Sequence, residues 1–482
     1  MLMPRLRAQS IQSARKPNLL VFLPDQFRAD VLACYGSRHA FAPNLDKLAS
    51  QSSIFSRAYI TQPVCTPSRS SLLSGTWPHW NGCIGNSSVL NPRLLCLPEL
   101  LVDNDYHTGY LGKWHLGDEF RAQHGFNEWL SIIDSKGTKV TDTSEAHEIS
   151  DYAKFLLAHG IKPKASEHGI FSKGFISRQP VEFSRVKFLE TKACEFLDRH
   201  AREPFILFVA FYEPHPPYNG PLNNEHPLDQ IELEPTFREF FGPDIPERYR
   251  QRQLVQAKTI APDTNSYRKI KQRYLGLVTE VDRSIGGVLT KLDQLGLDQN
   301  TIVVHTADHG DMMGAHGLFG KCVLFEESAR VPYLVRMPGQ NRACTITQPV
   351  SHIDFVPTLL DLLGKTHHDQ CAGASRAALL QGESKSAETI FLQWNGKDNV
   401  FKKSHMMPAN DAVLHEATRA AITPDGWKLC LRDIDKNELY NLTNDPREQH
   451  NLYNDAKYKD VIARLTDEIH RWQERHSDTL KV

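Results

Sequence analysis

The feature that most constrains the fold is a run of seven apolar residues, Phe205 to Phe211, without a polar interruption. A stretch of this length is far too short to cross a bilayer, which takes about 20 residues in a helix. Because it lacks the polar alternation of a half-exposed strand, it matches a strand that is buried on both faces. Shorter stretches rich in apolar and β-branched residues occur at residues 18–23 and 301–306, so the sequence predicts several buried strands.

Helical patterns lie between these runs. Residues 266–295 have the apolar periodicity of a long amphipathic helix. The other predicted elements are helices over residues 42–51, 97–103 and 351–363 and strands over residues 57–60, 107–111, 333–337, 389–394, 419–423 and 427–431. The alternation of strands and helices up to about residue 375 predicts an α/β sandwich with a mainly parallel sheet.

After about residue 375 the pattern changes to antiparallel strands. Asp425-Gly426 is a good hairpin turn between the last two of them, and residues 457–474 predict a terminal helix. We therefore expect a catalytic domain over residues 1–375 and a smaller α+β subdomain over residues 376–482.

Two long stretches, residues 131–176 and residues 219–264, are polar or rich in proline. We expect them to be irregular surface insertions, and such insertions often build a substrate pocket.

Composition excludes several classes of partner. The net charge is −1, so no overall field favours nucleic acid or an anionic membrane surface, and we expect neither. The nine cysteines are scattered without metal-finger spacing, so a disulfide framework is not expected. The N-terminal segment is basic but lacks the apolar core of a secretory signal. The chain as given is thus predicted to be cytoplasmic, or periplasmic or secreted if a signal was removed, and no oligomeric state is predicted.

A short segment, residues 65–69 (Cys-Thr-Pro-Ser-Arg), carries the strongest chemical signal. Thr66 is a residue that caps helices and Pro67 suits a first helical turn, so we expect a short helix over residues 68–73. Cys65 would then lie at a helix N-terminus, where free N–H groups and the helix dipole make a thiol unusually acidic. The alternative is a capped buried helix whose cysteine only packs in the core.

The segment continues through Ser74 and Gly75, and the whole stretch resembles the signature of the type I sulfatases of the alkaline phosphatase superfamily. The resemblance implies that a formylglycine-generating enzyme oxidises Cys65 to formylglycine. The hydrated aldehyde would attack the sulfur of a sulfate ester, and Arg69 would hold the diol and its charge. It also implies an alkaline-phosphatase-like sandwich with a mainly parallel central sheet and a smaller C-terminal subdomain.

Acidic residues follow two of the predicted buried strands. Asp25 comes after the first strand, and Asp308 and His309 come after a later one. Carboxylates at two strand ends can converge on one hard cation, although an isolated aspartate at such a place more often caps a helix. The resemblance implies one calcium ion held by Asp25, Asp308, His309 and an oxygen of the modified residue 65.

Gln26 departs from the family pattern, because a second aspartate is common at this position. Its carbonyl oxygen is still a suitable ligand, so we expect Gln26 to bind the metal as well. The change lowers the negative charge of the site, and the nitrogen ligand at His309 also suits softer divalent metals. Calcium is therefore the expected ion, with another divalent metal as the alternative.

The segment Gly112–Gly117 matches the GKWHLG segment of the family nearly residue for residue. Lys113 and His115 would point to the same side of an extended chain, so both would reach one bound group. The resemblance implies that Lys113 pairs with a sulfate oxygen. His115 would bind a hydroxyl group of the diol and take part in proton transfer.

Two more residues are assigned by resemblance. His215 lies in a PHxP-like segment after the most apolar run, and it would contact the sulfate and protonate the leaving oxygen. Lys321 follows Gly320 and matches the second lysine of the family, which neutralises the sulfate and the leaving oxygen. Without the other motifs, a proline-rich loop with an exposed histidine would be the simpler interpretation of His215.

For several aromatic and histidine side chains, the sequence allows two roles. Tyr218 lines the mouth of the pocket or is an ordinary loop aromatic, and His316 contacts the substrate or supports its loop. Trp77, His79 and Trp80 stack on a sugar ring or pack in the core.

The sequence thus predicts a sulfuric ester hydrolase that acts on a small-molecule or carbohydrate sulfate ester. The nearest alternative is a phosphonate or phosphate ester hydrolase of the same superfamily. A non-catalytic anion-binding protein is the alternative if Cys65 is not modified, and a phosphatase with Thr66 as nucleophile is a weaker one.

Overall fold

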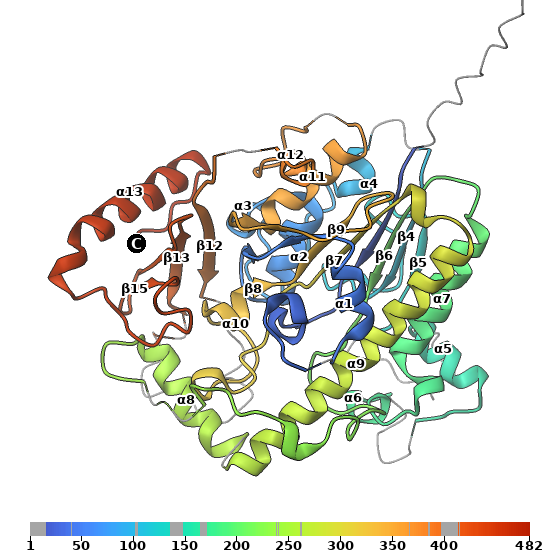
Figure 1. Ribbon diagram of the computed structural model, residues 1–482, viewed down its shortest axis with the longest axis horizontal. Coiled ribbons are helices and arrows are strands. Elements are labelled where there is room, and N and C mark those ends of the chain that lie inside the picture. Colours follow the sequence, from blue (N-terminus) through green and yellow to red (C-terminus); the bar gives the residue numbers. More distant parts are fainter. Residues whose placement is uncertain are drawn as a thin grey trace, which may run out of the picture.

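The computed structural model describes residues 16–39, 41–101, 105–134, 148–163, 171–237, 239, 241–260, 263–365, 367–383, 386–396, 413 and 415–482. An eight-stranded sheet with strand order β10-β2-β9-β7-β1-β6-β4-β5 lies at the centre of the main part of the chain (Figure 1). Its strands are β1 (Asn18–Phe22), β2 (Ser53–Phe55), β4 (His107–Gly112), β5 (Glu128–Leu130), β6 (Phe205–Ala210), β7 (Thr301–Thr306), β9 (Tyr333–Arg336) and β10 (Cys344–Ile346).

The central strands run in one direction. Parallel pairing joins β7 to β1, β1 to β6, β6 to β4 and β4 to β5, whereas β9 runs antiparallel to β7 and to β2. The predicted mainly parallel sheet is therefore confirmed. This topology brings the carboxyl ends of β1, β4, β6 and β7 to the same edge, which is where open α/β sheets place their ligand sites.

Helices cover both faces of the sheet, because alternate residues of the central strands face opposite sides. In β1, Leu20 and Phe22 belong to one apolar core, and Leu19 and Val21 belong to the other. The first core includes α1 (Pro43–Ala49), α7 (Arg185–Arg199) and α9 (Thr264–Gln294), and the second includes α2 (Cys65–Ser74), α4 (Leu97–Leu100) and α11 (Phe355–Leu362). The α/β sandwich is thus built as the apolar runs predict.

A four-stranded antiparallel sheet follows at the C-terminal end. It contains β12 (Ile390–Asn395), β13 (Ala417–Ile422), β14 (Trp427–Arg432) and β15 (Glu438–Asn441), and the terminal helix α13 (Lys459–Arg475) packs on it (Figure 1). The Asp425-Gly426 turn is confirmed, since Gly426 has φ 89° and its N–H donates to Thr423 O across 3.1 Å. Strand β15 lies in a turn-rich stretch and was not predicted. The division of the chain at residue 375 stays a prediction.

The expectation of irregular insertions is wrong at three places. Residues 219–264 contain the 13-residue helix α8 (Glu247–Thr259), and residues 131–176 contain α5 (Asp151–Ala158) and α6 (Lys173–Ile176). Helix α8 gives no apolar periodicity because polar side chains form its buried face: Arg248, fully buried, donates to Glu416 across 2.8 Å. Parts of the first insertion, residues 135–147 and 164–170, lie outside the described residues.

The other elements are short. They are a three-stranded sheet of β3 (Ala58–Tyr59), β8 (Arg330–Val331) and β11 (Val350–Ser351), the helices α3 (Pro78–Asn81), α10 (Glu326–Ala329) and α12 (Ala377–Leu380), and 3-10 turns at Ala29–Val31, Ala33–Tyr35, Val181–Phe183, Leu228–Gln230, Asp298–Asn300, Ala315–Gly317, His352–Asp354 and Ala456–Tyr458. The helix predicted from residue 97 ends at Leu100, and residues 102–104 lie outside the described residues.

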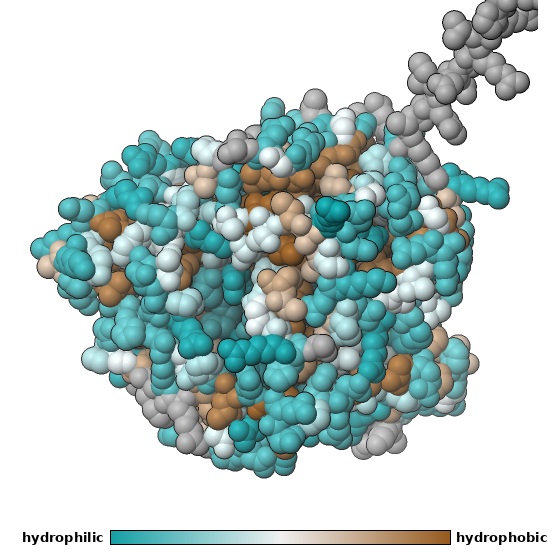
Figure 2. All heavy atoms as spheres, viewed as in Figure 1, coloured by the Kyte–Doolittle hydropathy of each residue, from teal (hydrophilic) through white to brown (hydrophobic). Residues whose placement is uncertain are grey.

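In the part of the chain that the structure describes, no helix combines the length and the apolar character that a membrane span requires. Figure 2 shows one face of the molecule, on which hydrophilic residues predominate and hydrophobic residues form small separate groups.

Candidate active site

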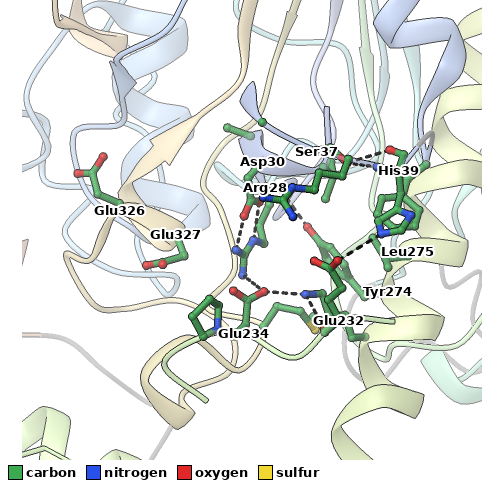
Figure 3. Close-up of a pocket in the computed structure, with 18 of the residues that line it drawn as sticks. Arg28, Asp30, Ser37, His39, Glu232, Glu234, Tyr274, Leu275, Glu326 and Glu327 are labelled. Atoms are coloured by element: carbon green, nitrogen blue, oxygen red, sulfur yellow. Dashed lines mark hydrogen bonds and ion pairs between the residues drawn. The ribbon is translucent and has the colours of Figure 1, made fainter. Parts of the chain in front are cut away.

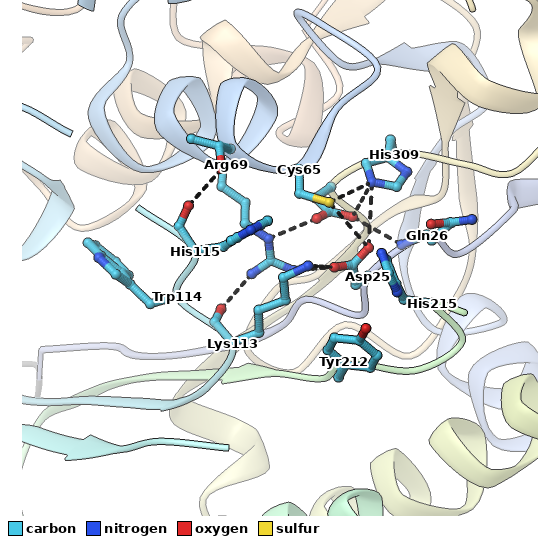
Figure 4. A network of polar contacts seen from close by, with 12 residues as sticks. Asp25, Gln26, Cys65, Arg69, Lys113, Trp114, His115, Tyr212, His215 and His309 are labelled. Atoms are coloured by element: carbon cyan, nitrogen blue, oxygen red, sulfur yellow. Dashed lines mark hydrogen bonds and ion pairs between the residues drawn. The ribbon is translucent and has the colours of Figure 1, made fainter. Parts of the chain in front are cut away.

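The predicted site residues meet at the carboxyl edge of the central sheet (Figure 4). Asp25 follows β1, Asp308 follows β7, Lys113 follows β4 and His215 follows β6. Cys65 opens α2, so its thiol enters the same place from a helix N-terminus. Residues far apart in the sequence come together here because the parallel strands all end at this edge.

Four of these side chains lie close enough together to hold one metal ion. Asp25, Cys65, Asp308 and His309 are buried, and each offers a ligand atom that lies within 4.8 Å of the others. Cys65 Sγ lies 3.3 Å from His309 Nε2 and 3.9 Å from Asp25 Oδ1. His309 Nε2 lies 3.5 Å from Asp25 Oδ1 and 3.6 Å from Asp308 Oδ1. Two carboxylates and an imidazole at this spacing fit one divalent cation.

Neighbouring cations orient the two carboxylates. Arg69 Nε donates to Asp308 Oδ2 across 2.8 Å, and Lys113 Nζ donates to Asp25 Oδ2. The other oxygen of each carboxylate, Oδ1, faces His309. Hydrogen bonds of this kind fix the direction of carboxylates, so Asp25 and Asp308 are held in an orientation that suits metal binding.

The position of Cys65 is strongly electropositive. Burial alone would raise the pKa of its thiol, but the positive charges of Lys113 and Lys321, with His309, hold the pKa well below its usual range. Lys321 Nζ donates to Cys65 Sγ across 2.9 Å. Burial would likewise raise the pKa of Asp25, and there too the nearby cations outweigh it and lower the pKa. The site therefore stabilises negative charge at residue 65.

The local structure around Cys65 differs from the prediction in one respect. Helix α2 begins at Cys65 after Val64, so Thr66 lies in the first turn and does not cap it. Thr66 Oγ1 instead donates to His115 O across 2.8 Å, and its N–H donates to Asn86 Oδ1 across 3.1 Å. The capping prediction for Thr66 is wrong because this threonine ties the helix to the loop after β4.

His115 reaches the site by a route that the sequence did not indicate. It has φ 61°, so the chain at Lys113–His115 is not extended and the same-side argument for the two residues is wrong. Its backbone N–H donates to Glu119 Oε1 across 2.8 Å, which holds this turn. The His115 side chain nevertheless lies close enough to Cys65 to lower the pKa of its thiol.

His215 is held as a neutral imidazole. Its Nδ1–H donates to Pro216 O across 2.8 Å, which leaves Nε2 for the side chain of Cys65. Burial, followed by the positive charge of Lys321, lowers the pKa of His215 to about 3. In this state Nε2 carries no proton, so the proton-donor role expected for His215 requires that it gain a proton once an anion is bound.

Gln26 lies beside the ligand set, but its side chain is engaged elsewhere. Its Oε1 accepts from Lys321 Nζ across 3.0 Å, and its Nε2 donates to Asp311 Oδ2 and Tyr218 Oη. Gln26 has φ 67°, and its backbone N–H donates to Asp308 Oδ1 across 3.0 Å. Its role as a metal ligand stays a prediction.

Asp311 was missed in the sequence. It is fully buried and accepts hydrogen bonds from Gln26 and from Tyr218 Oη, so it fixes the residue next to Asp25. Its position three residues after Asp308, in the same turn, was the available signal. Tyr218 therefore belongs to the network that supports the site.

The other candidates lie outside the cluster. His316 is 1% exposed and stacks on Phe325 with ring centroids 4.5 Å apart, so it supports its loop. Trp77 is buried against Trp472, and His79 contacts Gln393 and His476 O. Trp80 is 56% exposed, so its ring is open to solvent, whereas Trp77 is buried.

A separate cavity of about 540 Å³ contains none of the predicted site residues (Figure 3). Arg28 lies in it and pairs with Asp30 across 2.5 Å and with Glu234 across 3.4 Å. Tyr274 Oη forms part of the wall towards the site, since it accepts from Arg28 N–H and donates to Gln26 O. The carboxylates of Asp30 and Glu234 in this cavity are paired with Arg28.

Sequence comparisons identify relatives of the whole chain. The family model described as "Sulfatase" matches residues 17–365, and the one described as "N-sulphoglucosamine sulphohydrolase, C-terminal" matches residues 314–475. An N-acetylglucosamine-6-O-sulfatase of Bacteroides thetaiotaomicron is 27% identical over 97% of this chain and 88% of its own length.

Solved structures share the fold. BT4656, in complex with its substrate D-glucosamine-2-N,6-O-disulfate, superposes with a TM-score of 0.73 and 23% identity over 96% of this chain and 99% of its own. The phosphonate monoester hydrolase SpPMH of Silicibacter pomeroyi gives a TM-score of 0.77 and 21% identity over 96% of both chains. Both likenesses establish the architecture around the site.

Proposed function

Because the chain belongs to the sulfatase family, hydrolases of the alkaline phosphatase superfamily, we propose that it hydrolyses a sulfate monoester with residue 65 as the nucleophile. Cys65 would be oxidised to formylglycine by a formylglycine-generating enzyme, and one divalent cation, calcium, would lie beside it. The substrate would be a small-molecule or carbohydrate sulfate ester, as the printed names of several relatives indicate for those proteins.

The single observation that carries the proposal is the distinct environment of Cys65. Burial raises the pKa of four other buried cysteines, Cys83, Cys96, Cys371 and Cys430, as it does for a thiol that only packs in a core. At Cys65 the surrounding cations reverse this effect, and the pKa is lowered. An electropositive position at a helix N-terminus is suited to a nucleophile that carries negative charge during the reaction.

Asp25, Asp308 and His309 would hold the cation together with residue 65, and their spacing supports this assignment. The bound ion would supply positive charge that polarises an oxygen of residue 65. Gln26 would complete the set only if its Oε1 left Lys321, to which it is bonded here.

The basic residues would stabilise the charge of the transferring group. Lys113 is 2% exposed and Lys321 is 11% exposed, so both ammonium groups act where water screens them little. Arg69 would hold the oxygens of residue 65, from a position fixed by its bond to Asp308. His115 would move the proton of a hydroxyl group on residue 65, and His215 would assist the leaving oxygen.

A phosphonate or phosphate ester hydrolase is the second candidate, and the likeness to the phosphonate monoester hydrolase fold favours it. The segment around Lys113 and His115 supports sulfate, because it places cationic side chains around a singly charged ester. A non-catalytic anion site would follow if Cys65 stayed unmodified.

The test combines mass spectrometry with kinetics. The protein is produced with a formylglycine-generating enzyme, and the peptide that contains residue 65 is expected to carry an aldehyde in place of the thiol. Turnover of an aryl sulfate should exceed that of the matching aryl phosphonate and aryl phosphate.

Variants complete the test. Cys65→Ala should abolish turnover and Cys65→Ser should leave little, whereas Cys34→Ala, an exposed cysteine outside the site, should be unchanged. Full activity of Cys65→Ala would rule out the nucleophile assignment, and a preference for the phosphonate would favour the second candidate.

A further inference from the structure

Three cations surround one buried aromatic ring beside the site. The ring of Tyr212, 2% exposed, lies 4.0 Å from Arg185 Cζ, 5.3 Å from Lys113 Nζ and 5.2 Å from Lys173 Nζ, measured to the ring centroid. The same ring lies 4.7 Å from that of His215. Figure 4 places Tyr212 next to Lys113 and His215. Lys173 is therefore a neighbour of the predicted sulfate-binding groups.

Two of these three cations form an ion pair with a carboxylate. Arg185 donates from Nε and Nη2 to Glu213 Oε1 across 3.0 and 2.6 Å, and Lys113 pairs with Asp25. Lys173 has no carboxylate within ion-pair distance among the residues that the structure describes. It is also the exposed member of the three, so it is the one that a ligand from solution can contact.

The position of Lys173 is fixed by its helix. Ser172 caps α6 by accepting from Phe175 N–H across 3.1 Å. Asn219, in the loop that follows His215, donates to Ser177 O and Oγ across 3.1 Å each. The insertion that carries Lys173 is thus joined to the chain segment that carries His215.

The field at Lys173 is positive. Burial, followed by the charges of Lys113 and Arg185, lowers the pKa of Lys173 to about 8. An anion placed beside Lys173 would relieve this repulsion, and a charge-assisted hydrogen bond to it would be stronger than a neutral one.

We propose that Lys173 binds a second anionic group of the substrate, next to the sulfate ester that is hydrolysed. This inference rests on the proposed function and narrows its substrate class to sulfate esters that carry another carboxylate or sulfo group. Lys113, Arg69 and Lys321 serve the reacting sulfate, and Lys173 is a specificity-determining residue that touches a different part of the same molecule.

The first experiment measures binding without turnover. Sulfonates carry the same SO₃ group as a sulfate ester but have no ester bond to cleave. Isothermal titration of the metal-loaded protein compares benzenesulfonate with 3-sulfobenzoate and benzene-1,3-disulfonate. We expect one or both of the ligands with two anionic groups to bind about 10-fold more tightly than benzenesulfonate, and the better of the two identifies the second group.

Variants assign the preference to one side chain. Lys173→Met should bring the affinities of the three ligands to within about twofold, and Lys173→Arg should keep the preference. Lys154→Met is the matched control, because Lys154 lies on α5 of the same insertion and is paired with Asp151. It should leave all three affinities as in the wild type.

The second experiment measures turnover of an aryl sulfate with and without a ring carboxylate. Lys173→Met should lower kcat/KM about 10-fold for the carboxylated ester through KM, and by less than about twofold for the plain one. Equal affinities of the wild type for the three sulfonates, or equal losses on both esters, would overturn the inference while the proposed function stands. If none of the three sulfonates binds, the proposed binding site for the SO₃ group is contradicted, and the proposed function is contradicted as well.

Discussion

Lys321 Nζ donates a hydrogen bond to Cys65 Sγ across 2.9 Å, although 256 positions separate the two residues in the sequence. The same ammonium group lies 3.0 Å from Gln26 Oε1 and 3.9 Å from Asp25 Oδ1. Because Lys321 contacts Cys65, the proposed nucleophile, its removal directly tests how the site stabilises negative charge.

Lys321→Ala should lower kcat for an aryl sulfate about 10²- to 10³-fold, which is the usual effect of losing one preorganised charge contact in a transition state. The loss should be larger for an alkyl sulfate, whose leaving oxygen develops more charge. Lys271→Ala, which removes a lysine paired with Glu234 in the separate cavity, is the control and should stay near the wild-type rate. An unchanged kcat in Lys321→Ala would show that this ammonium group is not used.

Removal of the divalent cation should stop turnover, and added calcium should restore it. Asp308→Asn should lower both the bound metal, measured by elemental analysis of the purified protein, and kcat, because it removes a ligand charge and weakens the bond to Arg69. Asp198→Asn, an exposed carboxylate paired with Lys291, should change neither. Full activity after exhaustive chelation would contradict the metal assignment.

Glu280 should make stability depend on pH. It is 5% exposed, and burial followed by the charge of Glu213 raises its pKa from 4.5 to about 8. Between these values the folded protein holds a proton that the unfolded chain has lost. The free energy of unfolding should therefore fall as the pH rises from about 4.5 to about 8, and this contribution should not change further above that.

Urea unfolding of the wild type and of Glu280→Gln at pH 5.5 and 8.5 checks this dependence. The wild type should lose a few kcal/mol more than the variant between the two pH values, at most about 1.4 kcal/mol for each unit of pKa shift. Parallel losses in the two proteins would show that Glu280 titrates normally in the folded state.

Gly112→Ala should damage the site through the backbone. Gly112 ends β4 with φ 122°, and a Cβ atom there would lie 2.0 Å from Ala210 O on the neighbouring strand. We expect the free energy of unfolding to fall by about 3 kcal/mol or more, and kcat to fall because Lys113 follows directly. Gly296→Ala is the control, because Gly296 has φ 65° and a Cβ atom there would meet no atom within 4 Å. This variant has the backbone strain without the steric clash, so its free energy of unfolding should fall by only about 1 kcal/mol.

Much of the fold and of the candidate site could be predicted because buried parallel strands are recognisable in the sequence as short apolar runs. Apolar runs such as Phe205–Ala210 locate the central strands, and the polar residues that follow them are brought to one edge by the topology. The positions of Asp25, Asp308 and His215 follow from this rule and from the motifs.

The rest depends on contacts that leave no pattern in the chain. Helix α8 buries Arg248 against Glu416, so its inner face is not apolar and no periodicity reveals it. His115 adopts a left-handed conformation that only the fold enforces. The arrangement of Lys173 and Arg185 around Tyr212 arises from the packing of an insertion whose sequence gives no sign of where it lies.

The burial of Cys65 has a consequence for maturation. Its side chain is 0% exposed in the folded chain, and one of the groups that cover it, Lys321, is made long after it during synthesis. An oxidising enzyme would thus have access only while translation is under way or before tertiary contacts close. A molecule that completes folding before oxidation would retain its thiol. The fraction of active protein in a preparation would therefore depend on the rate of Cys65 oxidation relative to the rate of folding.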